Sequence, residues 1–340
     1  MVFSLDRHGL IENNEAMLHT TFKTYGQPTD VIELTESDAR ALESGEIRIR
    51  MLASPVNPAD INLIQGVYGI RPELPATAGV EGAGEVVESL SEGFQVGDRV
   101  ILVAHVGTWS EEVVCAEAAA LKIPKETPEQ QACMLKVNPL TAWCMLTQMV
   151  DLQEGAWIVQ NAANSGVGSC VIQIAKLLGL RTINLVRREE LIPELKALGA
   201  DHVLLDTKEN VAEVKALMAD KPAKLALNAV GGDSALRLMD ILAPEGLHVT
   251  YGAMSRRSLK VPNSFLLFKQ IQLRGFWVTK WLREQPSDVV GEAYERLAEW
   301  MIAGKLSQPI DSSFPLQEVE QAITRAMEDK RNGKVLITMG

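Results

Sequence analysis

The chain has 340 residues, of which 46% are hydrophobic and 23% charged, and its formal net charge is −11. This length and composition predict a globular protein of two domains with a sizeable core. The acidic balance argues against a nucleic-acid partner, because phosphate binding needs a basic face, and no apolar run is long enough to cross a membrane.

Short strands between glycine turns are predicted in the first part of the chain. Residues 17–22 and 46–53 read as the longer strands, the second with an alternating pattern, and residues 86–87, 99–103 and 113–114 as shorter ones. Strands of this length and spacing predict a distorted β-barrel.

Metal-ligand spacings are absent from the sequence. The four cysteines form no C-x-x-C pair, and no two of the five histidines have helical ligand spacing. We therefore expect no metal site, no disulfide framework and reduced thiols.

The stretch 157–188, WIVQNAANSGVGSCVIQIAKLLGLRTINLVRR, carries the clearest pattern in the chain. It reads as a strand, a glycine turn, a helix with an apolar stripe at i, i+3, i+4 and i+7, and a second strand. The turn at 163–168 occupies the place of G-x-G-x-x-G, with Gly168 kept and small residues at Ala163 and Ser165. A helix that begins there offers unpaired N–H groups to a pyrophosphate, so we predict a dinucleotide site.

Two cations follow the second strand of this unit. In an NAD site, an acidic residue about 20 positions after the turn accepts hydrogen bonds from the ribose 2′-hydroxyl. Here that place is held by Arg187 and Arg188. Because a guanidinium pairs with a 2′-phosphate and leaves a diol without an acceptor, the pair predicts NADPH rather than NADH.

Helices and strands alternate from about residue 130 onward, which predicts a doubly wound parallel sheet. The predicted helices are 190–198, 211–218, 234–242, 289–302 and 319–327. The predicted strands after the βαβ unit are 202–205, 225–230, 248–251, 271–278 and 334–338. The last of these strands is expected to rejoin the first domain.

Seven segments share their pattern with a known family. They are NPADINLIQGVYG (57–69), LPATAGVEGAGEVV (74–87), VNPLTAW (137–143), QNAANSGVG (160–168), TINLVRR (182–188), VTYGAM (249–254) and LLFKQIQLRGFWVTKW (266–281). Over nearly its whole length the chain resembles the medium-chain dehydrogenase/reductase superfamily, and within it the zinc-independent 2-enoyl thioester reductases of the mitochondrial trans-2-enoyl-CoA/ACP type. The resemblance implies an α/β plus β fold, with a GroES-like distorted β-barrel catalytic domain at 1–129 and 296–340 and a Rossmann NADPH-binding domain at 130–295.

The ligands of the zinc-dependent branch of that superfamily are missing. Where that branch carries a cysteine before its N-terminal helix, this chain has Ser54-Pro55-Val56-Asn57, and where it carries Gly-His-Glu, this chain has Gly79-Val80-Glu81. Catalytic zinc needs Cys, His or carboxylate ligands at fixed places. Reduction of an already polarised alkene therefore fits the sequence better than alcohol oxidation.

Hydride attack on the β-carbon of an α,β-unsaturated thioester builds negative charge on the thioester oxygen, which needs a hydrogen-bond donor. Tyr68 lies in a glycine-flanked loop and matches the tyrosine assigned as catalytic in the resembled reductases, where its phenol would donate to the oxygen or relay a proton. A loop tyrosine can instead pack its ring against the barrel. Asn57, Asn62 and Trp281 are predicted to lie in the substrate site. Helix capping, a polar helix face, and core or dimer packing are their respective structural alternatives.

The resemblance also implies a set of cofactor contacts that converge from several segments. They are Asn138, Asn164, Ser165, Gly166, Val167, Gly168, Arg187, Arg188, Tyr251, Gly252, Ala253, Met254, Phe276, Trp277, Val278, Thr279 and Lys334.

The implied function is reduction of the C2=C3 double bond of trans-2-enoyl-CoA or enoyl-ACP in fatty acid synthesis. An NADPH:quinone or enone oxidoreductase of the same fold and a non-catalytic NADPH-binding sensor are the alternatives. A shorter loop at 104–109 and the segment at 77–81 depart from the family pattern near the expected substrate side, so acyl chain length and substrate class stay open. A homodimer is the family expectation. The N-terminus does not read as a secretory signal, and the lack of the transit peptide expected of the mitochondrial type fits a bacterial cytoplasmic enzyme, or a mitochondrial one in processed form.

Overall fold

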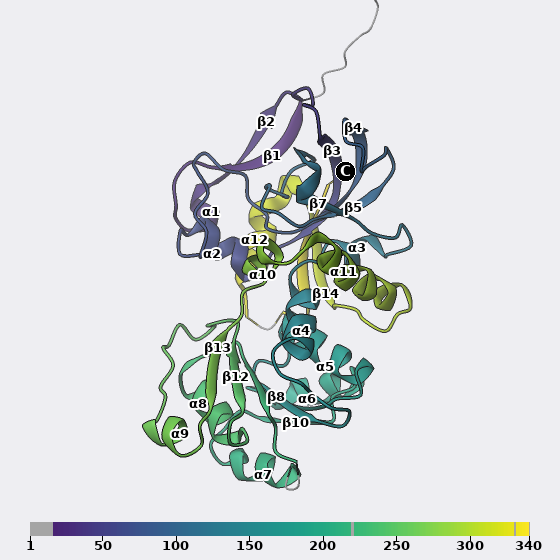
Figure 1. Ribbon diagram of the computed structural model, residues 1–340. Coiled ribbons are helices and arrows are strands. Elements are labelled where there is room, and N and C mark those ends of the chain that lie inside the picture. The colour runs from purple at the N-terminus through teal and green to yellow at the C-terminus, as the bar shows by residue number, and fades with distance from the viewer. Residues whose placement is uncertain (1–15, 219–220, 330, 340) are drawn as a thin grey trace, which may run out of the picture.

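The computed structural model describes residues 16–218, 221–329 and 331–339, so the N-terminal segment used above to judge targeting lies outside the described residues. Figure 1 shows two parts, one above the other. The upper part is mostly antiparallel sheet and includes both ends of the described chain, whereas the lower part is a parallel sheet flanked by helices.

The upper part is organised around one long strand, β3 (Glu46–Pro55), which is buried along most of its length. The sheet has seven strands in the order β14-β15-β3-β4-β5-β7, and β6 also pairs with β3. The other strands are β4 (Ala83–Ser89), β5 (Arg99–Leu102), β6 (Glu112–Ala116), β7 (Ala120–Lys122), β14 (Ile310–Pro315) and β15 (Lys334–Thr338). A separate two-stranded sheet is formed by β1 (Met17–Phe22) and β2 (Ile32–Ser37).

The strand β15 rejoins the first part of the chain, as the sequence predicted. It pairs antiparallel with β3 and parallel with β14. The helices of this part are α1 (Pro28–Val31), α2 (Pro58–Ile64), α3 (Glu129–Ala132) and α12 (Val319–Met327). Short 3₁₀ turns occupy Glu117–Ala119 and Leu316–Glu318. Because apolar residues of α12 and β15 are buried in the same cluster as those of β3, the C-terminal segment is an integral part of this core.

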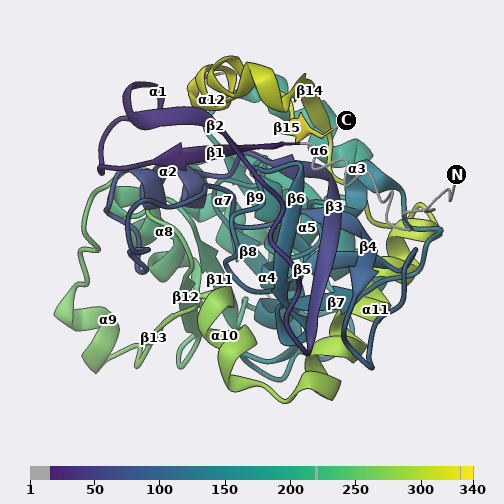
Figure 2. The same ribbon diagram turned by 90° about the horizontal axis from the view of Figure 1, so that it is seen from above.

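The lower part contains a six-stranded sheet in the order β10-β9-β8-β11-β12-β13, and every pair in it is parallel. Its strands are β8 (Trp157–Gln160), β9 (Arg181–Val186), β10 (His202–Leu205), β11 (Leu225–Asn228), β12 (Leu247–Thr250) and β13 (Gln272–Gly275). Its helices are α5 (Gly166–Leu177), α6 (Ile192–Ala197), α7 (Asn210–Leu217), α8 (Gly232–Ile241) and α9 (Asn263–Leu267). The predicted doubly wound parallel sheet is thereby confirmed, and Figure 2 shows its edge strand β13 beside α9 at the periphery.

Three helices lie where the two parts meet: α4 (Asn138–Thr147), α10 (Val278–Glu284) and α11 (Ser287–Ile302). One apolar cluster contains residues of β3 and β15 from the upper part, of β8 and β11 from the lower part, and of α4 and α11 between them. Because this core is continuous, the two parts are held in a fixed relation, and the ends of the parallel strands face the upper sheet across the junction.

Two predicted elements differ from the structure. The strand predicted at 271–278 ends at Gly275, and α10 begins at Val278. The helix predicted at 190–198 starts as the 3₁₀ turn Glu189–Leu191 and becomes α6 only at Ile192, because Pro193 lies at the start of the α-helix, where its missing N–H costs nothing. Among the described residues, no helix is long and apolar enough to cross a membrane.

Candidate active site

The predicted dinucleotide turn joins β8 to α5 at the edge of the parallel sheet that faces the junction. Ser165 caps α5, and its side-chain oxygen accepts a hydrogen bond from the Gly168 N–H at 3.1 Å. A Cβ at Gly168 would lie 2.6 Å from the Ala163 carbonyl oxygen, so only glycine lets the helix pack this close to the turn. A Cβ at Gly166 would lie 2.6 Å from Asn138 Nδ2 and 3.1 Å from Lys334 Cε. The turn therefore meets two predicted cofactor residues from distant parts of the chain.

Buried amide side chains hold the strand ends beneath this turn. Gln160 Nε2 donates to Asn184 Oδ1 at 2.7 Å, which connects β8 with β9. Asn161 Nδ2 donates to Asn228 Oδ1 at 2.8 Å and to Ser234 Oγ at 2.8 Å, which connects the turn with β11 and α8. These pairs were not predicted from the sequence. They fix the turn relative to the sheet, because a buried amide must keep its partners.

The two arginines after β9 differ in their surroundings. Arg187 is exposed and makes no ion pair with any described residue, while Arg188 Nε lies 3.4 Å from Glu190 Oε1. The nearest acid after β10, Asp206, is already engaged, since its carboxylate accepts from Arg237 Nε at 2.6 Å and from the Ser234 hydroxyl. Asp206 is therefore not free to accept a hydrogen bond from a ribose hydroxyl.

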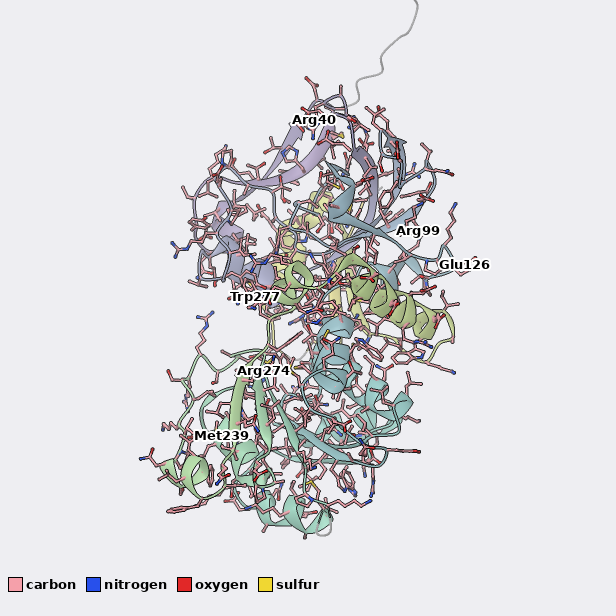
Figure 3. All side chains as sticks on the ribbon, in the orientation of Figure 1. Arg40, Arg99, Glu126, Met239, Arg274 and Trp277 are labelled. Carbon is pink, nitrogen blue, oxygen red and sulfur yellow. The ribbon has the colours of Figure 1, made fainter. Side chains whose placement is uncertain are left out.

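Tyr68 and Trp277 meet across the junction. Trp277 Nε1 donates to Tyr68 Oη at 2.9 Å, and the two rings are edge to face with centroids 5.9 Å apart. Gly69 permits the approach, because a Cβ there would already lie 3.2 Å from the Trp277 ring. Trp277 caps the N-terminus of α10, and Figure 3 labels it between the two parts. The candidate catalytic phenol is thus held by an element of the parallel-sheet part.

A buried charged cluster lies beneath α2. Asn57 Nδ2 donates to Glu81 Oε1 at 2.8 Å, and Lys334 Nζ donates to Asn57 Oδ1. Asp60 accepts from the backbone N–H of Asn57 and of Val80, each at 2.7 Å, which forms a capping box at the start of α2. Asn57 therefore does cap its helix, and in addition it links Lys334 to Glu81.

A second buried lysine completes the charge balance. Lys136 Nζ donates to the Val80 carbonyl oxygen at 2.6 Å and to the Ala104 carbonyl oxygen at 3.1 Å. Burial raises the pKa of Asp60 to about 7 and raises that of Glu81, whereas burial lowers the pKa of Lys136 to about 8 and lowers that of Lys334. Two carboxyl and two amino groups thus share one enclosed region, where removal of one charge would leave another without compensation.

The remaining predicted site residues lie in different surroundings. Asn138 Nδ2 donates to Gln308 Oε1 at 2.6 Å, which holds it beside Gly166. The Tyr251 hydroxyl is buried without a hydrogen-bond partner among the described residues, and burial raises its pKa. Asn62 lines a cavity together with Asn57. Gly252 packs against Ala229, where a Cβ would lie 3.2 Å from the carbonyl oxygen.

The other predicted site residues range from exposed to buried in the core. Asn164, Ala253 and Met254 are exposed, Val167, Phe276 and Thr279 are partly buried, and Val278 is buried in the core. Trp281 is also buried there, and its Nε1 donates to Gln148 Oε1 at 2.7 Å, so in this structure it packs between α10 and α4. A substrate contact of Trp281 stays a prediction.

Comparisons with known proteins agree with this geometry. The family model for the alcohol dehydrogenase GroES-like domain matches residues 43–125, and that for the zinc-binding dehydrogenases matches residues 166–298. The mitochondrial enoyl-[acyl-carrier-protein] reductases of rat and human are each 42% identical to this chain, over 94% and 93% of it and 87% of their own length. The chain belongs to this enoyl reductase family. The predicted combination of a GroES-like part with a Rossmann-type parallel sheet is confirmed.

Solved structures extend the comparison. The complex of Etr1p with NADP and crotonyl-CoA has a TM-score of 0.88 and 31% identity, and covers 95% of this chain and 99% of that one. The Etr1p/Etr2p heterodimer of the mitochondrial 2-enoyl thioester reductase from Candida tropicalis has a TM-score of 0.87, 30% identity and the same coverage. A protein from Bacillus thuringiensis described as an NADPH:quinone reductase also has a TM-score of 0.88, with 27% identity and the same coverage.

One family description mentions zinc. Among the described residues, no group of three or more His, Cys, Asp or Glu side chains is arranged to hold a metal ion. Ser54, at the position where the zinc branch has a cysteine, donates from its hydroxyl to the Glu81 carbonyl oxygen at 2.5 Å.

Proposed function

We propose that this chain reduces the C2=C3 double bond of trans-2-enoyl thioesters, as enoyl-CoA or enoyl-ACP, with NADPH. The observation that carries this proposal is the contact between Tyr68 and Trp277, because it places a phenol beside a segment assigned by resemblance to the cofactor. The 42% identity to the mitochondrial enoyl-[acyl-carrier-protein] reductases supports the same reaction and a place in fatty acid synthesis. The proteins in the solved complex bind NADP and crotonyl-CoA.

The residues around the turn fit a dinucleotide. The capped N-terminus of α5 suits a pyrophosphate, since its first N–H groups and the helix dipole favour negative charge. Gly168 lets α5 pack closely on the turn, and Gly166 lets Asn138 and Lys334 approach it. Arg187, exposed and without an ion pair among the described residues, together with Arg188, would hold the 2′-phosphate. Lys334 and Asn138 would contact the cofactor from the far side of the turn.

NADPH held by these residues would supply a hydride to C3 of the substrate. As that bond forms, the C2=C3 π electrons move toward C2 and the thioester oxygen, and a proton must then add at C2. The Tyr68 hydroxyl would donate a hydrogen bond to the thioester oxygen, where the negative charge develops, or relay the proton to C2. Trp277 would hold the phenol in place, since its N–H donates to the phenol oxygen and leaves the phenol proton free to point at the substrate.

The acyl chain is proposed to enter a cavity of about 230 Å³, which is lined in part by residues that follow Tyr68 in the chain. It is lined by Leu63, Ile70, Pro72, Ala76, Thr77, Gly79, His105, Val106 and Gly107. The segments 77–81 and 104–109, which depart from the family pattern, both contribute to it. Burial lowers the pKa of His105 to about 4, so its imidazole is neutral at pH 7 and compatible with an apolar ligand.

A homodimer formed through the edge strand β13 is part of the proposal. All four residues of β13 are exposed, and an unpaired edge strand is a ready site for pairing with a second chain. The heterodimer of Etr1p and Etr2p, two chains with a similar structure, supports dimerisation. Sedimentation of this protein as a monomer would refute the proposed homodimer. We also propose the domain division at residues 129/130 and 295/296, and a mitochondrial or bacterial cytoplasmic location.

Turnover with a panel of substrates tests the function. NADPH oxidation is expected with crotonyl-CoA and longer trans-2-enoyl-CoA thioesters, and turnover with a small quinone alone would establish the oxidoreductase alternative. No turnover with either substrate, despite NADPH binding, would favour the sensor.

The double variant Arg187→Gln/Arg188→Gln tests the cofactor choice. We expect the KM for NADPH to rise about tenfold or more, because charge-assisted hydrogen bonds to the 2′-phosphate are lost, while the KM for NADH stays unchanged. Arg50→Gln is a matched control, since Arg50 is an exposed residue of β3 whose side chain lies 3.7 Å from Glu85. An equal change in both KM values would contradict the assignment of the 2′-phosphate site.

A further inference from the structure

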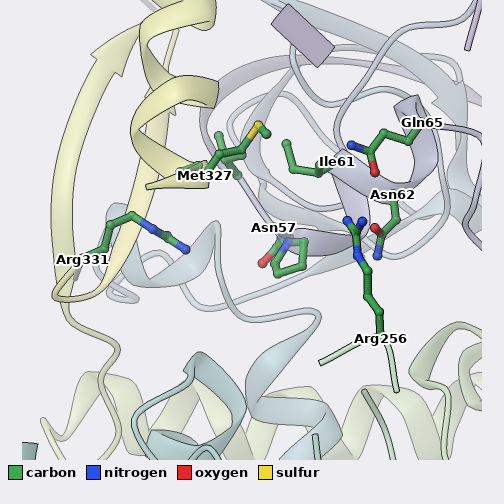
Figure 4. A pocket seen from close by; sticks show the side chains of 10 residues that line it. Asn57, Ile61, Asn62, Gln65, Arg256, Met327 and Arg331 are labelled. Atoms are coloured by element: carbon green, nitrogen blue, oxygen red, sulfur yellow. The ribbon is translucent and has the colours of Figure 1, made fainter. Parts of the chain in front are cut away.

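A second cavity, of about 260 Å³, lies where α2 and α12 of the upper part face a loop of the parallel-sheet part (Figure 4). Its walls are Val56, Asn57, Pro58, Ile61, Asn62, Gln65, Arg256, Ala326, Met327 and Arg331. Two of these side chains are guanidinium groups, and Figure 4 shows Arg256 and Arg331 entering the cavity from different segments.

The charge of this cavity is opposite to that of the protein. The chain carries a net charge of −11, yet the described residues that line the cavity include two arginines, three side-chain amides and no carboxylate. Neither arginine makes an ion pair with a described residue, and among those residues the two side chains make one hydrogen bond, from Arg331 Nε to the Glu328 carbonyl oxygen at 3.2 Å. Burial lowers the pKa of Arg331 even though the carboxylates of Asp311 and Asp329 act to raise it, so a bound anion would further stabilise its charge.

The Arg256 turn is built to hold its position. Arg256 has a backbone φ of 55°, in the left-handed region that an L-residue other than glycine or asparagine seldom adopts. The turn is tied down by hydrogen bonds from Arg256 N to the Ala253 carbonyl oxygen at 2.8 Å and from Ser255 Oγ to the Val230 carbonyl oxygen at 2.6 Å. Backbone strain that persists under such restraint is typical of ligand-binding positions.

The cavity and the dinucleotide turn are linked by two side chains. Asn57 lines the cavity and accepts a hydrogen bond from Lys334, and Lys334 Cε would lie 3.1 Å from a Cβ at Gly166. The cavity therefore lies next to the residues that surround the turn.

We propose that Arg256 and Arg331 together bind a phosphoryl group in this cavity and so bridge the two parts of the molecule. A guanidinium presents a planar fork of donors that matches phosphate oxygens, and two guanidinium groups at one cavity match the double negative charge of a phosphoryl group. Asn57, Asn62 and Gln65 supply amide donors to the remaining oxygens. The inference rests on the proposed function, which offers two sources of such a group: the phosphates of the thioester carrier, and the pyrophosphate of NADPH if the cavity shares it with the N-terminus of α5.

The variants Arg256→Gln, Arg331→Gln and Arg331→Lys distinguish these sources. The dissociation constant for NADPH is measured by quenching of protein fluorescence, and the KM is measured for crotonyl-CoA and for the crotonyl thioester of N-acetylcysteamine, which carries no phosphate. We expect each glutamine variant to weaken one ligand about tenfold, because a charge-assisted hydrogen-bond pair is lost. Arg331→Lys should recover part of the loss, since it keeps the charge and loses the fork.

A rise in the NADPH dissociation constant assigns the cavity to the cofactor, and a rise in KM for crotonyl-CoA but not for the phosphate-free thioester assigns it to the carrier. Arg296→Gln, an exposed residue of α11 that pairs with Glu299, is the control and should change neither quantity. If both glutamine variants, with wild-type melting temperatures, bind NADPH and crotonyl-CoA as the wild type does, the inference is wrong although turnover stands. If the wild type lacks thioester turnover while the variants still weaken NADPH, the proposed function fails and the cavity assignment survives.

Discussion

Replacement of Tyr68 by phenylalanine is expected to lower kcat with crotonyl-CoA by about 10²- to 10³-fold, while the dissociation constant for NADPH changes little. The substitution removes one hydroxyl that would donate to the thioester oxygen only as negative charge builds there. It leaves the ring, which packs edge to face on Trp277, in place. Because the lost interaction belongs to the transition state, kcat and kcat/KM should fall together.

Tyr25→Phe provides a matched control in the same part of the fold. The Tyr25 hydroxyl donates to the Pro72 carbonyl oxygen at 2.8 Å, and its ring packs against Gly66 at the start of the Tyr68 loop. This variant should lose about 1 kcal/mol of unfolding free energy and keep its kcat. Equal losses of kcat in the two variants would show that Tyr68 supports the loop and takes no part in the reaction.

Trp277→Phe separates positioning from chemistry. The change keeps an aromatic ring and removes the N–H that donates to Tyr68 Oη at 2.9 Å. Loss of a neutral hydrogen bond of about 1 kcal/mol predicts a decrease in kcat of about fivefold. In the Tyr68→Phe background the same change should have no further effect on kcat, because the phenol oxygen that it positions is already absent.

The cofactor half of this protein can be predicted from local sequence, because its determinants lie close together in the chain. A strand, a small-residue turn and an amphipathic helix within 157–188 can pack compactly in one arrangement. In the structure, β8, α5 and β9 occupy the predicted places. Arg187 and Arg188 come directly after β9, so the end of that strand sets their position. The same locality explains why the parallel sheet could be predicted from alternation alone.

The charged cluster beneath α2 depends on contacts that no local pattern encodes. Lys334 and Asn57 are 277 positions apart, and Asn57 and Glu81 are 24 apart. A lysine near the C-terminus reads as a solvated side chain, yet pairing of β15 with β3 carries Lys334 into the interior, where it is 8% exposed. Charged residues become buried here because several chain segments bring opposite charges to one place.

The segment after β13 shows the limit of reading apolar runs. Phe276, Trp277 and Val278 continue the strand pattern, and a short apolar run can belong to a strand or a helix. The structure ends the strand at Gly275 and starts α10 at Val278, so that Trp277 turns toward Tyr68 and Trp281 packs against Gln148. Of the two tryptophans predicted as site residues in this segment, Trp277 therefore contacts Tyr68, whereas Trp281 packs in the core.

Gly168→Ala should weaken NADPH binding by about tenfold to a hundredfold and lower the melting temperature, because overpacking of a fixed site costs about 1–3 kcal/mol. The added Cβ would lie 2.6 Å from the Ala163 carbonyl oxygen, 2.7 Å from that of Ala162 and 2.8 Å from the Ala163 carbonyl carbon. All three atoms are backbone, so no side-chain rotation can relieve the contacts. The turn or the first turn of α5 must move, and the N–H groups that would hold the pyrophosphate move with it.

Gly291→Ala adds the same methyl group at a position where it meets no neighbouring atom. Gly291 lies within α11, and a Cβ there would meet no atom within 4 Å. Alanine should therefore stabilise the protein by about 0.5–1 kcal/mol, through the higher helix propensity of alanine, with NADPH affinity unchanged. Calorimetric melting and NADPH titration of both variants measure the contrast. Wild-type NADPH affinity in Gly168→Ala would mean that the close packing of α5 on the turn does not shape the phosphate site, and the dinucleotide assignment would then lose its geometric basis.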